Sequence, residues 1–591
     1  MTLAVVHRLT IPEPATHLVH VETRVTSKVG HLPDEFVLFM AVWTPGSYLI
    51  REYSRHVEGF AAEAPARATK TRKNAWRIRT AGSERAIVRY RVYAGELTVR
   101  TSHVDASHAF LVGAGLFLGV EGQENLGARI EIDAPDGWLA TTSLAPARGA
   151  GQSGVLSFEA PDFDTLVDSP IELGPHRLER FEAHGKPHRL AICPPGAIND
   201  ADAKKLVSDA KTIVETQAKL LGTGLPYEAY ELLLHVSAHG RGGLEHRSSA
   251  ALIVPPSSFE TREAYLDLLS LVAHEVFHAW NVKRIRPAGL TPYRYGEECY
   301  TRLLWWFEGG TSYYDWRTLA LARLCSVQEY LDHLAGEIAY VEQTPGRHLH
   351  ALEEASYDAW IKLYRPDENL ANSSVSYYRK GEVVCALLDI ELRARTAGRA
   401  TLDGVLSHLW VEFGAPQRAV PEDALQAVFE RVAGVPLGDL FETWVRGTGD
   451  IDYARTLAHV GLSVERAARP DAAGCSLGLR VRAESGRTIV TSVVRASAAW
   501  RAGFDSGDEI IAIGGARVEG TNIDGTLRGR APDERVDIVS VHNTRLVTRS
   551  VALDPPRPDR VKIVFSPEAS DGAREAFRAW LGHEPPPGAS A

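Results

Sequence analysis

The 591-residue sequence predicts a multidomain α+β protein, because it is long and because its apolar residues change their spacing twice. At roughly 150 residues per domain, a chain of this length contains several domains. Apolar and polar residues alternate early in the chain, helical spacing follows in the middle, and short strands with glycines return after about residue 464. We therefore expect a β-rich domain at 1–180, a mainly helical domain at 181–467, a small β domain at 468–560 and a tail with a short helix at 561–591.

The N-terminal domain is expected to be a β-sandwich or an open β-saddle. Residues 17–26, 75–80 and 85–94 alternate apolar and polar side chains, and residues 35–43 form an apolar, aromatic run. Glycine, proline and aspartate, which favour turns, separate these segments. Several short strands at this spacing are typical of sheets that bury one face.

The middle of the chain is expected to be mainly helical. Residues 202–221 carry apolar side chains at helical spacing and end at Gly222, and a strand is expected at 230–237. From about residue 262 the helical pattern continues with interruptions at prolines. Shorter helices are expected at 401–413, 421–433, 437–444 and, before a proline-rich tail at 584–588, at 570–581.

Composition and charge exclude several classes of protein. Apolar residues make up 45% and charged residues 24% of the chain, values that fit a globular protein rather than a disordered or fibrous one. A formal charge of −10 argues against a nucleic-acid partner, which a basic surface would attract. No apolar run approaches the ~20 residues that span a bilayer, and the first residues do not resemble a secretory signal. We therefore expect a cytoplasmic chain without a membrane span, or a periplasmic one if a signal was removed; the oligomeric state is not predicted.

The cysteines are expected to be isolated buried thiols. Their number is odd and no C-x-x-C pair occurs, so the sequence indicates neither a disulfide framework nor a thiolate zinc site. The five are Cys193, Cys299, Cys325, Cys385 and Cys475.

The strongest chemical signal is an H-E-x-x-H motif, His274-Glu275-Val276-Phe277-His278. On a helix, residues four apart lie on one face with Cβ atoms ~5–6 Å apart, so both imidazoles can reach one zinc ion. Glu275 follows the first histidine, and its carboxylate can act on the attacking water without binding the metal. The alternative is a helix with two packed histidines.

A third ligand is needed for a hydrolytic zinc site, and Glu308 is the candidate. It lies thirty residues after His278 in an aromatic, apolar helix, where a lone carboxylate is costly to bury unless it is paired or metal-bound. Asp315 lies two helical turns further on the same face and can orient a ligand histidine. The alternatives are an ion pair of Glu308 with Arg302 and a solvated position for Asp315.

These motifs resemble the M61 family of peptidases, glycyl aminopeptidase-like gluzincins related to the M1 aminopeptidases. Trp43-Thr44-Pro45-Gly46-Ser47-Tyr48 followed by Ile50-Arg51 is similar to the family's N-terminal signature, and residues 274–287, HEVFHAWNVKRIRP, are similar to its zinc helix. The resemblance implies a thermolysin-like catalytic domain at 181–467, one Zn²⁺ per chain and removal of small N-terminal residues such as Gly or Ala from peptides.

Two further segments resemble elements of the M1 group. Gly242-Gly243-Leu244-Glu245-His246 is similar to its G-x-M-E-N element, with Leu and His replacing Met and Asn. The resemblance implies an edge strand whose main chain pairs with the substrate and a Glu245 that binds the α-ammonium. The alternative for Glu245 is an ordinary surface glutamate. Residues 375–381, VSYYRKG, are similar to its Y-x-K-G element, which assigns oxyanion stabilisation to Tyr378, with Tyr377 as the rival and core packing as the alternative.

Several polar residues near these motifs are left with two interpretations. Residues 283–286, KRIR, either form a solvated basic patch or balance the charge of the glutamates in the site. Four histidines without ligand-like spacing are expected to be structural or exposed: His103, His108, His235 and His239.

The small β domain resembles a PDZ domain. Residues 502–515, AGFDSGDEIIAIGG, are the most specific part of this resemblance. It implies a carboxylate-binding loop at Leu477, Gly478 and Leu479 and a C-terminal peptide ligand that adds a strand to an exposed edge. The alternative is a structural cap without a ligand.

The sequence therefore predicts a zinc aminopeptidase that acts on peptides with a free N-terminus. Two other functions stay open: an endopeptidase or oligopeptidase that uses the same zinc, and a PDZ-centred binding or scaffold protein on an inactive peptidase fold.

Overall fold

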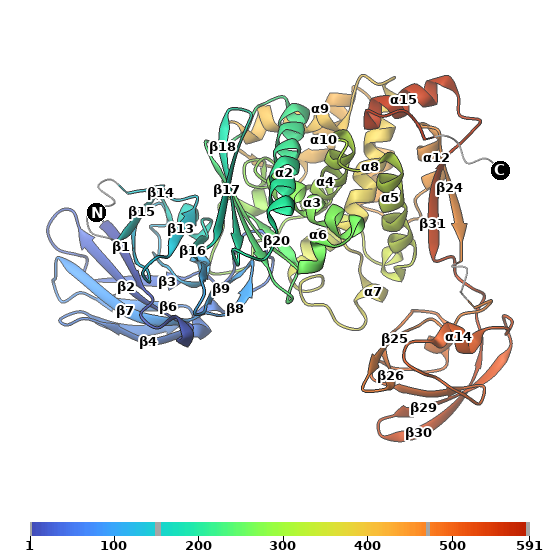
Figure 1. The fold of residues 1–591 in the computed structure, drawn as a ribbon, viewed down its shortest axis with the longest axis horizontal. Coiled ribbons are helices and arrows are strands. Elements are labelled where there is room, and N and C mark those ends of the chain that lie inside the picture. Colours follow the sequence, from blue (N-terminus) through green and yellow to red (C-terminus); the bar gives the residue numbers. More distant parts are fainter. Residues whose placement is uncertain (1–2, 148–154, 469–472, 587–591) are drawn as a thin grey trace. The chain divides into compact units, whose positions relative to one another are not determined.

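The computed structural model describes residues 3–147, 155–468 and 473–586 (Figure 1). The chain forms two compact units. Pro587 and Gly588 of the expected tail, and residues 469–472 at the start of the expected small β domain, lie outside the described residues. The first unit comprises Met1–Thr301, Tyr314–Leu324 and Leu406–Ala424, and the second comprises Arg302–Tyr313, Cys325–Val405 and Leu425–Ala591.

The N-terminal part of the first unit is β-rich, as predicted. In β2 (Leu18–Ser27) and along most of β7 (Arg85–Tyr93), buried and more exposed residues alternate, which matches the predicted alternation. The predicted apolar run begins with β3 (Glu35–Met40), and β6 (Ala75–Arg79) pairs with it. The largest sheet has seven strands in the order β14 (Ala145–Pro146), β15 (Leu156–Ala160), β12 (Ala128–Asp133), β1 (Leu3–Thr10), β2, β7 and β4 (Val57–Ala62).

Two smaller sheets complete this part, whose strands are drawn in blue and cyan in Figure 1. Apolar side chains from all three sheets share one buried core. The four-stranded sheet is β11 (Leu118–Val120), β3, β6 and β5 (Arg67–Arg72), and the five-stranded sheet is β13 (Leu139–Thr142), β16 (Ile171–Gly174), β10 (Ala109–Leu111), β9 (Thr101–Val104) and β8 (Gly95–Thr98).

A second five-stranded sheet of the first unit carries the segments of the predicted site. Its central strands, β19 (Tyr230–Val236) and β21 (Ser249–Val254), are parallel and buried at every residue, as expected for strands covered on both faces. The order is β17 (Arg177–Ala183), β18 (Lys186–Cys193), β19, β21 and β20 (Gly242–Glu245), so β20 forms an edge.

Two helices of the first unit are tied together beside this sheet. The helix predicted at 202–221 is α2 (Asp200–Leu221), capped by the Asn199 side chain and ended by Gly222 in a left-handed conformation. The buried Gln217 amide of α2 donates to the Ala273 carbonyl of α3 (Arg262–Phe277) at 2.7 Å. This bond holds α2 against the turn of α3 that carries the H-E-x-x-H motif.

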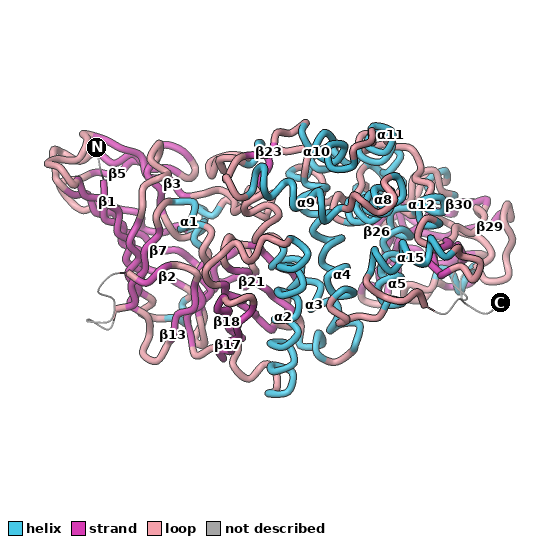
Figure 2. The backbone as a smooth tube through the Cα atoms, turned by 90° about the horizontal axis from the view of Figure 1, so that it is seen from above, coloured by secondary structure: helices cyan, strands magenta, loops and turns pink. Residues whose placement is uncertain are grey.

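The second unit is built around α8 (Arg379–Arg395), which is buried on nearly all sides. Helix α5 (Val327–Glu342) lies beside α8 (Figure 2) and begins with a capping box. Tyr313 donates to Asp389 of α8 at 2.7 Å and accepts from Trp580 of α15 (Asp571–Leu581) at 3.0 Å. The predicted helix 570–581 is thereby confirmed and joined to the helical core.

The helices predicted at 401–413, 421–433 and 437–444 are also found, although two of them continue as π-helical turns. They are α9 (Leu402–Leu409) with Trp410–Gly414, α10 (Ala424–Ala433), and α11 (Gly438–Leu440) with Phe441–Val445. The remaining elements are α1 (Phe163–Val167), α4 (Thr311–Leu321), α6 (Leu352–Tyr357), α7 (Leu370–Ser373), α12 (Tyr453–Ala458), β22 (Arg286–Pro287), β23 (Ala419–Val420), β24 (Leu462–Ala467) and β31 (Arg560–Phe565).

The C-terminal part of the second unit contains a separate sheet with its own apolar core. Buried Asn372 of α7 links it to the helices, because its side chain donates to the Val493 carbonyl and accepts from the Arg495 amide, both at 2.8 Å. The strands are β25 (Leu479–Glu484), β26 (Arg487–Val493), β27 (Glu509–Ile513), β28 (Ala516–Arg517), β29 (Arg535–His542) and β30 (Arg545–Ala552), accompanied by α13 (Ala498–Arg501) and α14 (Ile523–Leu527).

None of the helices that the structure describes is both long and apolar enough to cross a bilayer. All five cysteines are buried, and none of them forms a disulfide bond with another described residue, as predicted.

Candidate functional site

The two histidines of the H-E-x-x-H motif meet at the C-terminal end of α3. The Thr261 side chain caps the start of this helix, His274 lies in its last turn, and His278 is the first residue beyond it. The centres of the two imidazole rings are 4.7 Å apart. The spacing of four residues therefore places the rings side by side, as helical geometry requires.

Each imidazole is oriented by an acceptor at Nδ1. His274 Nδ1 lies 3.0 Å from Asp315 Oδ2, and His278 Nδ1 lies 2.8 Å from the Asn281 carbonyl oxygen. Because a carbonyl can only accept, His278 must carry its proton on Nδ1, and the Asp315 carboxylate favours the same tautomer for His274. Both rings can then present an unprotonated Nε2, which is the form that binds a metal ion.

Glu275 is buried against the main chain of strand β20. Its side chain is grouped with those of Glu245 and His278, whose ligand atoms all lie within 4.8 Å of one another. A Cβ atom added at Gly243 would lie 2.0 Å from Glu275 Oε1. Only glycine at this position leaves room for the Glu275 carboxylate.

Glu245 ends the edge strand β20 and is only 4% exposed, so it is not an ordinary surface glutamate. One side of its carboxylate packs on Gly46 of the W-T-P-G-S-Y segment, where an added Cβ would lie 2.2 Å from Glu245 Oε2. Gly46 also has φ +88°, a conformation that favours glycine. On the other side, Lys283 Nζ lies 3.8 Å from Glu245 Oε1.

Asp168 belongs to this network, although nothing in the sequence pattern marked it. It accepts from Lys283 Nζ at 2.9 Å and from the Arg247 amide at 2.7 Å, and it pairs with His246 at 3.2 Å. Burial opposes ionisation of Asp168, but Lys283 and His246 outweigh it and keep the pKa of this carboxyl below its usual range.

Lys283 is 1% exposed, so the interpretation of residues 283–286 as a solvated patch is wrong for this residue. Burial acts to lower the pKa of Lys283, but the neighbouring Asp168 and Glu245 raise it above its usual value, and the ammonium stays charged. Arg284 donates to the Ala279 and Arg247 carbonyls, and burial with the nearby Arg247 lowers its pKa to about 9. The positive charge of Lys283 therefore lies beside the buried carboxylates of Asp168 and Glu245 and does not face solvent.

The remaining predicted residues lie in the second unit. Glu308 is 2% exposed within a π-helical segment, Trp305–Gly310. Gly309 of this segment packs directly on Gly381 of α8, where an added Cβ on Gly309 would lie 2.5 Å from the Gly381 Cα. This close approach brings Glu308 to the start of α8. Arg302, named above as the alternative partner of Glu308, has its Nη1 3.6 Å from Glu353 Oε1.

Tyr377 and Tyr378 stack with ring centres 4.8 Å apart just before α8. Tyr377 is fully buried, whereas Tyr378 retains some exposure, and its hydroxyl lies 3.3 Å from that of Tyr364. Burial, with the negative charge of Glu308 as a smaller effect, raises the pKa of Tyr378 well above its usual value. The Tyr378 phenol is therefore a neutral hydrogen-bond donor.

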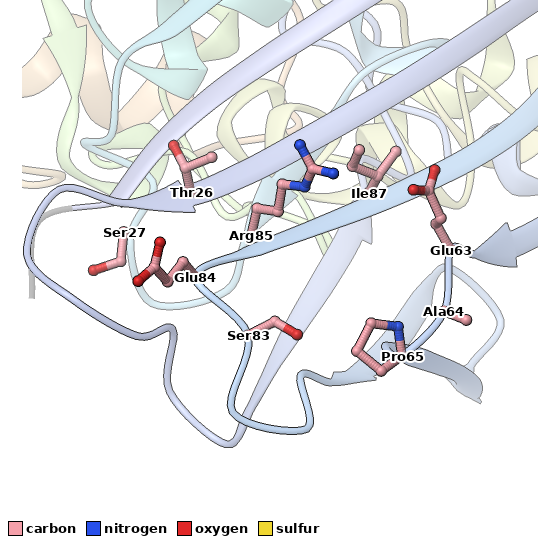
Figure 3. A pocket seen from close by; sticks show the side chains of 9 residues that line it. All are labelled: Thr26, Ser27, Glu63, Ala64, Pro65, Ser83, Glu84, Arg85 and Ile87. Atoms are coloured by element: carbon pink, nitrogen blue, oxygen red, sulfur yellow. The ribbon is translucent and has the colours of Figure 1, made fainter.

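A cavity of about 560 Å³ in the N-terminal part is separate from these residues (Figure 3). It lies between the ends of β2 and β7 and the turn that follows β4, with Glu63, Glu84 and Arg85 on its walls. None of the predicted site residues lines it, and it carries no candidate chemistry.

Residues 7–175 match the family described as Peptidase M61 N-terminal domain, and residues 267–384 match M61 glycyl aminopeptidase. The chain belongs to the M61 peptidase family. The second match includes both motif histidines, Glu275, Glu308 and the tyrosine pair. Glu245 lies between the two matched segments of this M61 peptidase, and the C-terminal sheet lies beyond them.

One solved structure supports the same assignment. The M61 chain is similar to an aminopeptidase N family protein from Idiomarina loihiensis, with 29% identity, a TM-score of 0.90, and coverage of 98% of this chain and 100% of that one. An M1 zinc metallopeptidase from Deinococcus radiodurans, solved with a Tyr-Ser-Ala substrate, matches with 15% identity and a TM-score of 0.48 over 76% of this chain and 95% of that one. A search of curated proteins gave no match.

Gly243→Ala tests the close contact between β20 and Glu275. The added methyl group would overlap Glu275 Oε1, so the carboxylate must move, and we expect peptidase kcat/KM to fall by about tenfold or more. The control is Gly336→Ala on α5, where an added Cβ meets no atom within 4 Å. Equal activity of the two variants would show that the contact with Gly243 does not position Glu275.

Proposed function

We propose that this M61 peptidase is a zinc-dependent aminopeptidase that removes small N-terminal residues, with Gly and Ala preferred, from peptides. The observation that carries the proposal is the pair of imidazoles on α3, each held through Nδ1 by an acceptor. His274, His278 and Glu308 would hold the ion: two imidazoles at the end of α3 and a buried carboxylate on the segment Trp305–Gly310. The catalytic domain then spans residues 181–467.

The residues fit zinc rather than a harder cation. Two imidazole nitrogens and one carboxylate are a common catalytic zinc set, whereas magnesium and calcium prefer oxygen ligands. When bound, zinc supplies Lewis acidity that activates a water molecule and polarises the scissile carbonyl.

Glu275 is the proposed general base. It is 4% exposed, and its close contact with the backbone of Gly243 keeps its side chain beside His278. In this position its carboxylate can take a proton from the attacking water and return one to the leaving amine. Tyr378 donates a hydrogen bond to the developing oxyanion, and we favour it over Tyr377 because Tyr377 has no exposed surface.

Charge balance supports Glu245 as the anchor for the substrate N-terminus. Asp168 takes the two close contacts of this network, from Lys283 and His246, whereas Lys283 Nζ stays 3.8 Å from Glu245 Oε1. A buried carboxylate whose cation lies beyond hydrogen-bond distance favours a further positive partner, such as a substrate α-ammonium. The shortest contact of Lys283 Nζ is with Asp168. Glu245 Oε1 therefore has no hydrogen bond from the described residues.

Glu275→Gln separates metal binding from catalysis. The variant keeps both imidazoles and Glu308, so we expect bound zinc at the wild-type level, while loss of the base lowers kcat by about 100-fold or more. Elemental analysis and turnover of alanyl-amide substrates measure the two effects. A wild-type chain purified without zinc would refute the enzyme proposal, and full activity in Glu275→Gln would exclude this residue as the base. A zinc-loaded wild type without peptidase activity would favour the scaffold alternative.

Glu245→Gln tests the exopeptidase assignment. Wild type is expected to cleave free peptides and not their N-acetylated forms, and Glu245→Gln is expected to lower kcat/KM on free peptides by about 100-fold. Glu263→Gln, at an exposed position on α3, is the matched control. Equal wild-type rates on free and acetylated peptides would instead indicate an endopeptidase with the same zinc ligands.

We also propose that the C-terminal sheet is a PDZ-like domain, spanning residues 468–560, that binds a peptide C-terminus. Within the described residues, strand β25 pairs with a neighbour on one side only, and it begins at Leu479, directly after Leu477 and Gly478. A cavity of about 970 Å³ opens beside this loop, and several arginines line it, which suits a carboxylate. These are Arg347, Arg466, Arg480, Arg495 and Arg557.

Peptide binding by this domain is measured best on the full chain. We expect fluorescence anisotropy to show binding of a labelled peptide with a free C-terminal carboxylate. The same peptide with an amidated C-terminus should not bind. Arg480→Glu should weaken the complex at least tenfold, whereas Arg535→Glu, an exposed change on β29, should leave it unchanged. Absence of binding for a broad set of C-terminal sequences would favour a structural cap.

A further inference from the structure

A group of side chains that could hold a metal ion lies in the first unit and includes none of the residues proposed for catalysis. Its centre is Glu172 on β16, which is 1% exposed. Glu172 Oε1 lies 2.9 Å from Nδ1 of His108, the residue before β10, and Oε2 lies 2.9 Å from Nε2 of His235 on β19. Cys193, the last residue of β18, completes a trio with His108 and Glu172 whose ligand atoms all lie within 4.8 Å of one another.

Glu172 is a buried carboxylate with an imidazole at hydrogen-bond distance from each oxygen. Burial opposes ionisation of Glu172, but His235 and His108 outweigh it and lower its pKa to about 2, so the carboxylate is charged. The groups that stabilise this charge are imidazoles rather than lysine or arginine. Burial and the nearby Glu172 raise the pKa of the Cys193 thiol, which keeps it protonated as long as no cation is present. A divalent cation bound to one carboxylate and one thiolate would be electrically neutral.

A third imidazole beside the group has an unused nitrogen. His176 is 5% exposed, and its Nε2 lies 2.8 Å from Thr141 Oγ1. Its Nδ1 has no hydrogen-bond partner within residues 3–147, 155–468 and 473–586. Glu172, His108 and His235 are close enough for their charges to act on the pKa of His176, which burial lowers most. Buried nitrogens of this kind are costly to leave unpaired, and they are potential metal ligands.

We propose that His108, Glu172 and Cys193 form a second metal site, for a divalent ion that accepts thiolate ligands, such as zinc. One imidazole, one carboxylate and one sulfur suit zinc or cobalt and disfavour magnesium and calcium. The hydrogen bond from His235 to the other Glu172 oxygen orients the carboxylate, as such outer contacts do in known sites. Binding releases the thiol proton of Cys193 to solvent.

The proposed ion joins two sheets of the first unit. Glu172 and His108 belong to the sheet that contains β16 and β10, whereas Cys193 and His235 belong to the sheet that contains β18 and β19 (Figure 1). The second of these sheets also contains β20, which carries Glu245. The role of the ion is therefore structural, because it fastens the N-terminal β-rich part to the sheet that borders the catalytic residues.

Cobalt substitution distinguishes this site from the catalytic one, because the catalytic ligands contain no sulfur. A Co²⁺–thiolate charge-transfer band in the near ultraviolet reports a cysteine ligand, and His274, His278 and Glu308 cannot produce it. We expect the full chain, stripped of metal and titrated with Co²⁺, to show the band with one equivalent per chain. His278→Ala, which removes a catalytic ligand, should retain it.

Cys193→Ser should abolish the band and lower the zinc content of purified protein from two ions per chain to one. Cys475→Ser, at another buried free cysteine, is the matched control and should change neither value. Because Cys193→Ser can also disturb folding, the wild-type spectrum is decisive by itself. Absence of the band in wild type saturated with Co²⁺, or its persistence in folded Cys193→Ser, would overturn the proposal and leave a metal-free His–Glu–His hydrogen-bond network.

Discussion

The ion pair between Lys283 and Asp168 is the interaction on which the predicted site of the first unit depends. Both groups are buried, and a buried charge without a partner destabilises a protein strongly. Lys283 follows the end of α3, Asp168 follows α1, and His246 follows strand β20. One ammonium and one carboxylate thereby fix the end of the motif helix, the N-terminal part and the edge strand to one another. The position of Glu245 follows from this arrangement.

Main-chain contacts at two glycines are equally important to the shape of the site. Gly46 and Gly243 allow the carboxylates of Glu245 and Glu275 to lie directly against the backbone, at distances that a Cβ atom would prevent. Each of the two carboxylates therefore contacts backbone atoms of a glycine, which cannot move aside by a change of side-chain rotamer. This explains in physical terms why the segments W-T-P-G-S-Y and G-G-L-E carry glycine at these positions.

Much of the architecture could be predicted, because helical spacing, capping residues and β alternation are local properties. Helix α2, strand β19 and helix α15 begin and end within two residues of their predicted bounds. The spacing of His274 and His278 predicted that their rings meet, and the apolar surroundings of Glu308 predicted its burial. Asp168 could not be found in this way, since a single aspartate in a turn has no periodic signal and its partners are more than 75 residues away in the sequence. The burial of Lys283 was hidden for the same reason, because a run of basic residues is normally solvated.

Asn372 connects the C-terminal sheet of the second unit to the segment that precedes Tyr378. Its side chain binds the carbonyl of Val493 and the amide of Arg495, so it behaves as a one-residue strand at the end of β26. Both groups belong to a buried contact, and separating them would leave an amide and a carbonyl without partners. Asn372 is six residues before Tyr378, and the chain between them contains the short turn that leads into α8. Only six residues of chain therefore separate the contact with β26 from the phenol that we assign to the oxyanion.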